Sequence, residues 1–79
     1  MRERYTEKQG QYLAFIYYSI KIHGHSPAEA EMQGYFGVTP PAVHQMVLAL
    51  ERHGLIERTA GKARSIRLLL PRHALPDLE

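Results

Sequence analysis

Cysteine is absent from this chain of 79 residues. Without thiols there is no disulfide scaffold, no thiolate zinc site and no cysteine nucleophile. Long apolar runs are also missing, since no stretch approaches the roughly 18 to 20 apolar residues of a membrane span. No signal-peptide pattern opens the chain. We therefore expect a soluble, cytoplasmic protein.

The chain has little length to spare for a catalytic site. Hydrophobic residues make up 44% and charged residues 23% of the sequence, as in folded domains and unlike disordered chains. A chain of this length forms one small domain, with room for a core but hardly for an enzyme cleft. None of its serines has a base visible in the sequence, and its carboxylates resemble caps and solvated charges. We predict no enzymatic activity and no cofactor.

Histidine raises the possibility of a metal site. His23 and His25 are near neighbours in a predicted loop, and His44 and His53 belong to one predicted helix. No i, i+4 histidine pair and no cluster of ligating carboxylates accompanies them. We predict no metal site.

A strong charge of one sign is lacking too, because the formal net charge is only +2. The basic residues are concentrated in the C-terminal half, where Glu57 is the only acid between positions 52 and 72. By itself this bias does not identify a nucleic-acid partner. The basic residues in this interval are Arg52, Arg58, Lys62, Arg64, Arg67 and Arg72.

The first part of the chain predicts a helix over about residues 7–22. Thr6 followed by Gln9 forms a capping-box pattern, and apolar residues then recur until Gly24. These residues form two stripes, of which the first contains Tyr12, Leu13, Ile16 and Ile20. The second stripe contains Phe15, Tyr18 and Ile22. Either later segments cover this second stripe, or it is exposed and supplies the contact of a homodimer.

Two further helices follow, separated by a short turn. The second predicted helix starts with Ser26 as its cap, Pro27 as its first helical residue and Glu29 as the carboxylate that closes the capping box. It runs to about Phe36 and ends at Gly37. The third begins after a second cap, Thr39, with Pro40 and Pro41 in its first turn, and Gly54 ends it. Such a pair of helices is a helix-turn-helix candidate.

The faces of the third predicted helix differ in character. Val43, Met46, Val47 and Leu50 fall on one face, which we expect to be buried. The opposite face carries Pro41, His44, Gln45, Leu48 and Arg52.

The rest of the chain predicts a β-hairpin and a tail. The strand-like runs "LIER" (55–58) and "SIRLLL" (65–70) flank the basic loop "TAGKAR", with Gly61 at its centre. Residues 71–79 contain Pro71 and Pro76 and are expected to lie extended. The predicted architecture is mainly α with a small β-hairpin, in one domain over residues 1–70 followed by a C-terminal tail.

Three ordered patterns make the chain similar to a known family. They are "T..Q..YL.FI...I...GHSPAEAEM", "GVTPPAVHQMVLALERHGLIE" and a small-residue wing followed by "SIRLL". Over about residues 5–70 the sequence resembles the winged helix-turn-helix DNA-binding domain of LexA-type repressors. The resemblance implies that the third helix enters the major groove and contacts bases through Thr39, Pro41, Ala42, His44 and Gln45. It also implies that the wing residues Lys62 to Ser65 lie near phosphate.

The sequence departs from this family in two respects. Pro41, His44 and Gln45 stand where LexA itself has Asn and two Glu, so we expect a different operator. The self-cleaving peptidase domain of LexA, with its Ser and Lys dyad and its dimer interface, has no counterpart in this sequence. We therefore do not expect derepression by cleavage.

The residue types suit contacts with DNA, although each has a simpler explanation. Gln45 can bond adenine bidentately, His44 can donate to a guanine acceptor, and Ala42 or Pro41 can touch a thymine methyl group. The alternative for these residues is a merely solvated helix face. Basic side chains of the hairpin can neutralise phosphates, but such a loop can also be only a soluble turn. Arg52 can reach the DNA backbone, or its charge can simply interact favourably with the helix dipole.

We predict a sequence-specific double-stranded DNA-binding protein that regulates transcription, with the third helix in the major groove and the basic wing on the DNA backbone. The alternative is a winged-helix module that binds protein instead of DNA. The predicted DNA-binding residues are Thr39, Pro41, Ala42, His44, Gln45, Arg52, Arg58, Lys62, Arg64 and Ser65.

Overall fold

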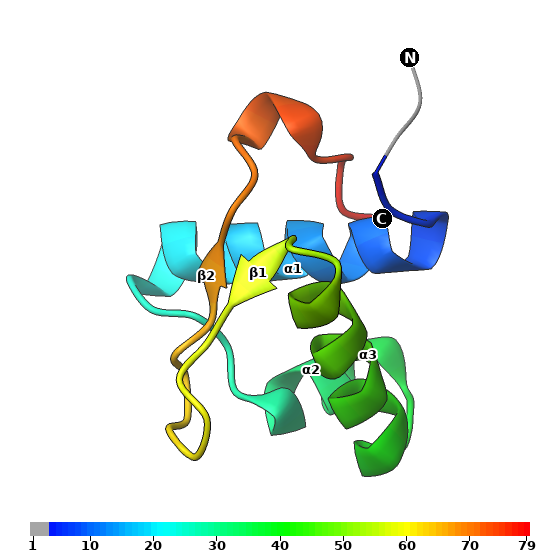
Figure 1. Ribbon diagram of the computed structural model, residues 1–79, viewed down its shortest axis with the longest axis vertical. Coiled ribbons are helices and arrows are strands. Elements are labelled where there is room, and N and C mark those ends of the chain that lie inside the picture. The colour runs from blue at the N-terminus through cyan, green and yellow to red at the C-terminus, as the bar shows by residue number, and fades with distance from the viewer. Residues whose placement is uncertain (1–3) are drawn as a thin grey trace.

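The computed structural model describes residues 4–79 and contains a three-helix unit with a two-stranded hairpin (Figure 1). Its elements are α1 (Glu7–His23), α2 (Glu29–Phe36), α3 (Pro40–Arg52), β1 (Ile56–Glu57), β2 (Arg67–Leu68) and the 3-10 helix η1 (Arg72–Ala74). The strands pair antiparallel, with Ile56 opposite Leu68 and Glu57 opposite Arg67. The predicted winged helix-turn-helix, mainly α with a small hairpin, is confirmed.

The start of α1 follows the predicted capping box. The Thr6 hydroxyl accepts a hydrogen bond from the Gln9 amide (3.1 Å), and the Thr6 amide donates to the Gln9 side chain (2.9 Å). Two orphan donors of the first turn are thereby satisfied. Gly24, with φ of 81°, ends the helix in the left-handed conformation that glycine adopts without strain. No helix within residues 4–79 has the length and apolar character needed to cross a bilayer.

The start of α2 differs from the prediction. The helix begins at Glu29 rather than Pro27, and the amide of its cap residue Ala28 donates to Glu31 (2.7 Å). Ser26 is only 4% exposed, and its hydroxyl accepts from the Ile66 amide (3.1 Å) just before β2. The predicted capping role of Ser26 is wrong because a distant backbone donor, invisible in the local sequence, occupies its hydroxyl.

The proline-opened third helix forms as predicted. Thr39 is the cap, and its hydroxyl lies 3.4 Å from the Ala42 amide, which donates to it. Pro40 and Pro41 occupy the first two helical positions, where a missing amide leaves no intrahelical hydrogen bond unmade. After α3, Gly54 adopts a left-handed conformation, with φ of 74°, and the chain turns into β1.

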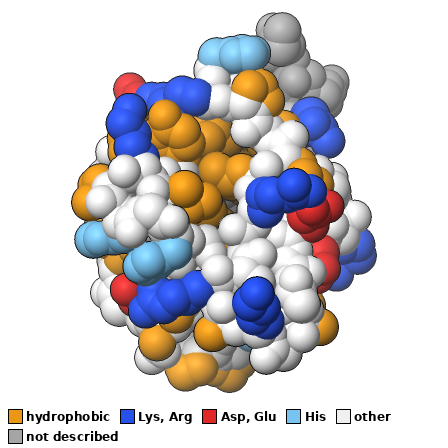
Figure 2. Space-filling view, turned by 90° about the vertical axis from the view of Figure 1, so that its left-hand side faces the viewer, with side chains coloured by type: hydrophobic (Ala, Val, Ile, Leu, Met, Phe, Trp, Pro, Cys, Tyr) orange, Lys and Arg blue, Asp and Glu red, His pale blue; other side chains and the backbone are white. Residues whose placement is uncertain are grey.

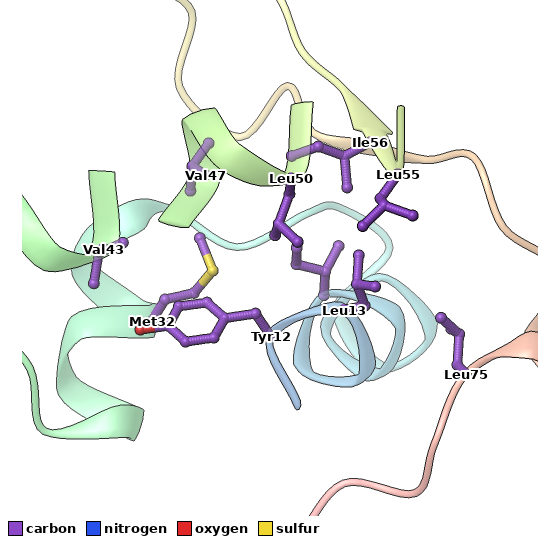
Figure 3. Close-up of a cluster of buried hydrophobic side chains, with 10 residues drawn as sticks. Tyr12, Leu13, Met32, Val43, Val47, Leu50, Leu55, Ile56 and Leu75 are labelled. Atoms are coloured by element: carbon purple, nitrogen blue, oxygen red, sulfur yellow. The ribbon is translucent and has the colours of Figure 1, made fainter. Parts of the chain in front are cut away.

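The core joins all three helices to the hairpin (Figure 3). Side chains of α1 and α3 point toward one another in the close-up, with Met32 of α2 between them. Each buried aliphatic or aromatic side chain contributes about 1.5–3 kcal/mol, so this cluster fixes the orientation of α3. Its members are Tyr12, Leu13, Ile16, Met32, Val43, Val47, Leu50, Leu55, Ile56 and Leu75.

The C-terminal segment, predicted to be an extended tail, is partly helical and folds back over α1. It contains η1, and Leu75 belongs to the core. Gln11 holds the segment from α1, because its side chain donates to the carbonyl of Asp77 (2.9 Å) and accepts from the amide of Glu79 (2.8 Å). In Figure 1 the segment lies on the far side of the molecule from the hairpin loop. Its residues pack on the rest of the domain because Leu75 supplies an apolar anchor.

The second apolar stripe of α1 is largely covered. The ring of Phe15 lies 4.7 Å from that of Tyr35 on α2, measured between centroids. The hydroxyl of Tyr18 accepts a hydrogen bond from the Arg72 guanidinium (3.1 Å) in the C-terminal segment. Ile22, in contrast, is 71% exposed. Of the two alternatives for this stripe, coverage by later segments therefore holds for Phe15 and Tyr18, whereas Ile22 stays exposed.

Candidate nucleic-acid interface

Three segments that are distant in the sequence meet at one edge of the molecule. The first turn of α2, the N-terminal half of α3 and the hairpin loop all lie along the lower edge in Figure 1. An open groove of about 360 Å³ lies between them. Half of the residues predicted to bind DNA line this groove, namely His44, Arg58, Lys62, Arg64 and Ser65. The fold thus brings the candidate recognition helix and the candidate wing together.

The outer face of α3 is available to a partner. The buried side chains of Val43 and Val47 direct this face outward, and Thr39, Pro41, Ala42, His44 and Gln45 are all exposed. Thr39 also caps the helix, so its hydroxyl already accepts one hydrogen bond.

The last turn of α3 carries a further cation. Arg52 is exposed and makes no ion pair with any of residues 4–79. Its position near the C-terminal end of the helix suits the helix dipole. The side chain is nevertheless free to contact an anion.

A carboxylate of α2 holds the histidine of α3. Nδ1 of His44 lies 3.2 Å from Oε2 and 3.3 Å from Oε1 of Glu29. The two residues are 15 positions apart, so the fold and not a helical repeat brings them together. This contact ties α2 to the exposed face of α3.

A second carboxylate of α2 holds the wing. Nη1 of Arg64 donates to Oε1 of Glu31 (2.7 Å). The Ala28 amide and then the Arg64 guanidinium hold the pKa of Glu31 below its usual value, because both favour the ionised carboxylate. Arg64 itself has a left-handed backbone, with φ of 56°, which is uncommon for a residue other than glycine. The Glu31 contact therefore stabilises an unusual turn at the wing.

Ser65 organises the wing internally. Its hydroxyl accepts from the amide of Thr59 (3.0 Å) and lies within donating distance of the carbonyls of Lys62 (2.9 Å) and Thr59 (3.1 Å). Gly61, with φ of 77°, makes the tight turn possible. The Lys62 side chain is exposed and makes no ion pair within residues 4–79. The loop thus presents one free ammonium group on a hydrogen-bonded turn.

Two arginines of the hairpin, Arg58 just after β1 and Arg67 in β2, have carboxylate partners. Nε of Arg58 donates to Oε1 of Glu51 on α3 (3.2 Å), and the Arg58 side chain is only 19% exposed. Arg67 pairs with Glu57 across the two strands. Arg58 therefore joins the hairpin to the helix, in addition to lining the groove.

Figure 2 shows the side of the molecule that carries the hairpin. Lys and Arg side chains are spread over this face around an apolar hollow, and the smaller acidic patches in view lie beside them. Within residues 4–79, no three histidine or carboxylate side chains are grouped so as to hold a metal ion. The chemistry of this side of the molecule therefore favours an anionic partner.

Sequence patterns alone did not identify Glu29 and Glu31 as parts of the candidate interface. Glu29 was expected to close a capping box, but Glu31 performs that role and Glu29 holds His44 instead. The only local signal is the pair of acids at the start of a helix. Their partners lie 15 and 33 positions away, so only the tertiary fold identifies them.

Comparison with known proteins gives consistent matches to one family. The family model described as LexA DNA binding domain matches residues 2–65. The LexA repressor of Thermosipho melanesiensis is 39% identical over 67 residues, which cover 85% of this chain and 34% of that protein. The LexA repressor of Bordetella parapertussis is 36% identical over 80 residues, covering 100% of this chain and 37% of the relative. The chain thus spans about a third of the length of these curated relatives.

Proposed function

The chain belongs to the LexA DNA binding domain family, and on this premise we propose that it binds double-stranded DNA sequence-specifically and represses transcription. The observation that carries the proposal is the groove where His44 of α3 faces Lys62, Arg64 and Ser65 of the wing. A helix that reads bases and a basic loop that holds phosphates need this kind of juxtaposition.

In this proposal the first two turns of α3 enter the major groove. The groove is about 12 Å wide and admits one helix. Gln45 is exposed on the outer face and suits bidentate bonding to adenine, while Pro41 and Ala42 suit contact with a thymine methyl group. Pro40 and Pro41 have no amide hydrogens to offer to phosphate. Side chains and the wing must therefore supply the contacts with the DNA backbone.

The residues expected near the DNA backbone have different roles in this proposal. Lys62 and Arg52 are exposed and lack ion-pair partners within residues 4–79, so we assign them the direct phosphate contacts. Arg64 contacts phosphate from the position in which its ion pair with Glu31 holds the guanidinium. Arg58 and Ser65 mainly hold the wing in place through Glu51 and the loop backbone.

We further propose that two copies bind one site. Helix-turn-helix proteins commonly bind as dimers to half-sites that are one helical turn apart or a multiple of that distance. In the second apolar stripe of α1, Ile22 is the only strongly exposed side chain. The proposal of two copies therefore rests on the two-fold symmetry that helix-turn-helix dimers share with their sites. Sedimentation with and without a bound duplex tests it, and a 1:1 complex at all concentrations would contradict it.

The test of sequence-specific binding is selection of bound sites from a random duplex library, followed by titration of the selected and a scrambled duplex. Gln45→Ala should weaken binding to the selected duplex by about 1–3 kcal/mol and leave binding to the scrambled duplex nearly unchanged. Gln33→Ala, on α2 outside the groove, is the matched control and should change neither. Failure to retain any duplex at low salt would instead favour the protein-binding alternative.

A further inference from the structure

The two ring nitrogens of His44 have different surroundings. Nδ1 is within hydrogen-bond distance of both oxygens of Glu29, whereas Nε2 has no hydrogen-bond partner among residues 4–79. The side chain is about half exposed (49%), on the face that the proposed function places in the major groove. Nε2 is therefore the nitrogen that can meet a base.

The carboxylate of Glu29 determines the hydrogen-bonding character of that free nitrogen. An ionised carboxylate can only accept hydrogen bonds, so Nδ1 must carry a hydrogen to bond it. In the neutral imidazole this leaves Nε2 without a hydrogen, as an acceptor. In the protonated imidazole both nitrogens donate. Through Nε2, His44 thus presents an acceptor when the ring is neutral and a donor when the ring is protonated.

Adenine and guanine differ at the corresponding atom of the major groove. Adenine presents the N6 amino group, which donates, where guanine presents O6, which accepts. A histidine acceptor suits adenine, and a histidine donor suits guanine. The same side chain therefore favours different purines in its two protonation states.

Charged groups from two elements surround His44. Glu29 and Glu31 come from α2, and Arg58, Lys62 and Arg64 come from the wing. Among the described residues, Glu29 is the one that contacts the ring. The ring thus lies in a groove that carries charges of both signs.

We propose that Glu29 is a positioning residue for base recognition, which fixes the Nδ1–H form of His44 and so makes one purine position of the DNA site pH-dependent. This inference rests on the proposed function, since it needs His44 to meet a base. It changes the expectation that His44 donates to guanine, because donation from Nε2 now requires a protonated ring.

The experiment uses the duplex selected with the full chain and a set of variants in which each purine of the site is exchanged between adenine and guanine. Affinities are measured at about pH 5.5 and 8.5, on either side of the range in which histidine titrates. At one position the adenine-to-guanine affinity ratio should fall by about five- to tenfold on acidification. His44→Gln should abolish that change, since glutamine does not titrate there.

Variants of Glu29 separate positioning from a general structural role. Glu29→Gln should reduce the adenine preference at pH 8.5, because the amide can donate as well as accept and no longer imposes one tautomer. Glu7→Gln is the matched control, since Glu7 is likewise the first residue of its helix but lies outside the groove, and it should keep the wild-type pH change.

The outcomes distinguish this inference from the proposed function. The inference would be overturned, while DNA binding stands, if the adenine-to-guanine affinity ratio did not change with pH at any position. It would also be overturned if Glu29→Gln kept the wild-type ratios at both pH values. Absence of any duplex selectivity at either pH would overturn both.

Discussion

The difference between Lys62 and Arg58 gives a sharp prediction. Both are cations that line the groove, but Lys62 has no ion-pair partner within residues 4–79 and Arg58 is bound to Glu51. Each phosphate contact contributes about 0.9 to the slope of log affinity against log salt concentration. Lys62→Ala should therefore reduce the magnitude of this slope by about 0.9. Between 50 and 200 mM salt, the wild type should lose about 3.5-fold more affinity than this variant.

Arg58→Ala should behave differently. Its slope should stay within about 0.3 of the wild type, because the guanidinium is held by a carboxylate. Its free energy of unfolding should fall by about 1 kcal/mol, since the ion pair and the packing of the side-chain stem are lost. The assays are duplex titration at four salt concentrations and urea unfolding. Equal loss of slope in the two variants would refute the division of roles, and an unchanged slope in Lys62→Ala would refute its phosphate contact.

Three predictions concern stability in urea unfolding. Gly10→Ala should cost about 1–3 kcal/mol, since the new Cβ would lie 2.8 Å from Cε1 of Tyr5; an unchanged midpoint would contradict that packing. Ser26→Ala should cost about 1–3 kcal/mol by leaving the Ile66 amide without its acceptor, and no loss would refute that role. The lowered pKa of Glu31 contributes stability above the ordinary carboxyl range that is lost as pH falls through the lowered value. Glu31→Gln should therefore be less stable at pH 7, with a deficit that shrinks toward pH 3; a constant deficit would refute this linkage.

Features set by neighbouring residues could be predicted from the sequence. The capping box of Thr6 and Gln9 and the Thr39 cap before two prolines need only local geometry, and both formed as expected. The buried face of α3 followed from helical periodicity, because Val43 and Val47 recur at the helical spacing.

Features set by distant residues could not be predicted in this way. Ser26 has the local pattern of a cap, but the Ile66 amide lies 40 positions away and takes its hydroxyl. The Glu29 contact with His44 and the anchoring of the tail by Leu75 likewise depend on how the elements pack. The groove residues could be proposed individually from the sequence, but their carboxylate partners could not, since charge partners at long range leave no periodic signal.

The central claim, that the outer face of α3 and the wing together bind DNA, is most directly tested by NMR. Amide chemical shifts of the isotope-labelled full chain would be followed during titration with the duplex selected from a random library. The largest shifts should fall at the amides of Thr39, of residues 42–45 and of residues 59–65, with little change at the amides of the C-terminal segment 71–79 on the far side of the molecule. Shifts concentrated in that segment and in the first turn of α1, with residues 39–45 unaffected, would contradict the proposed interface.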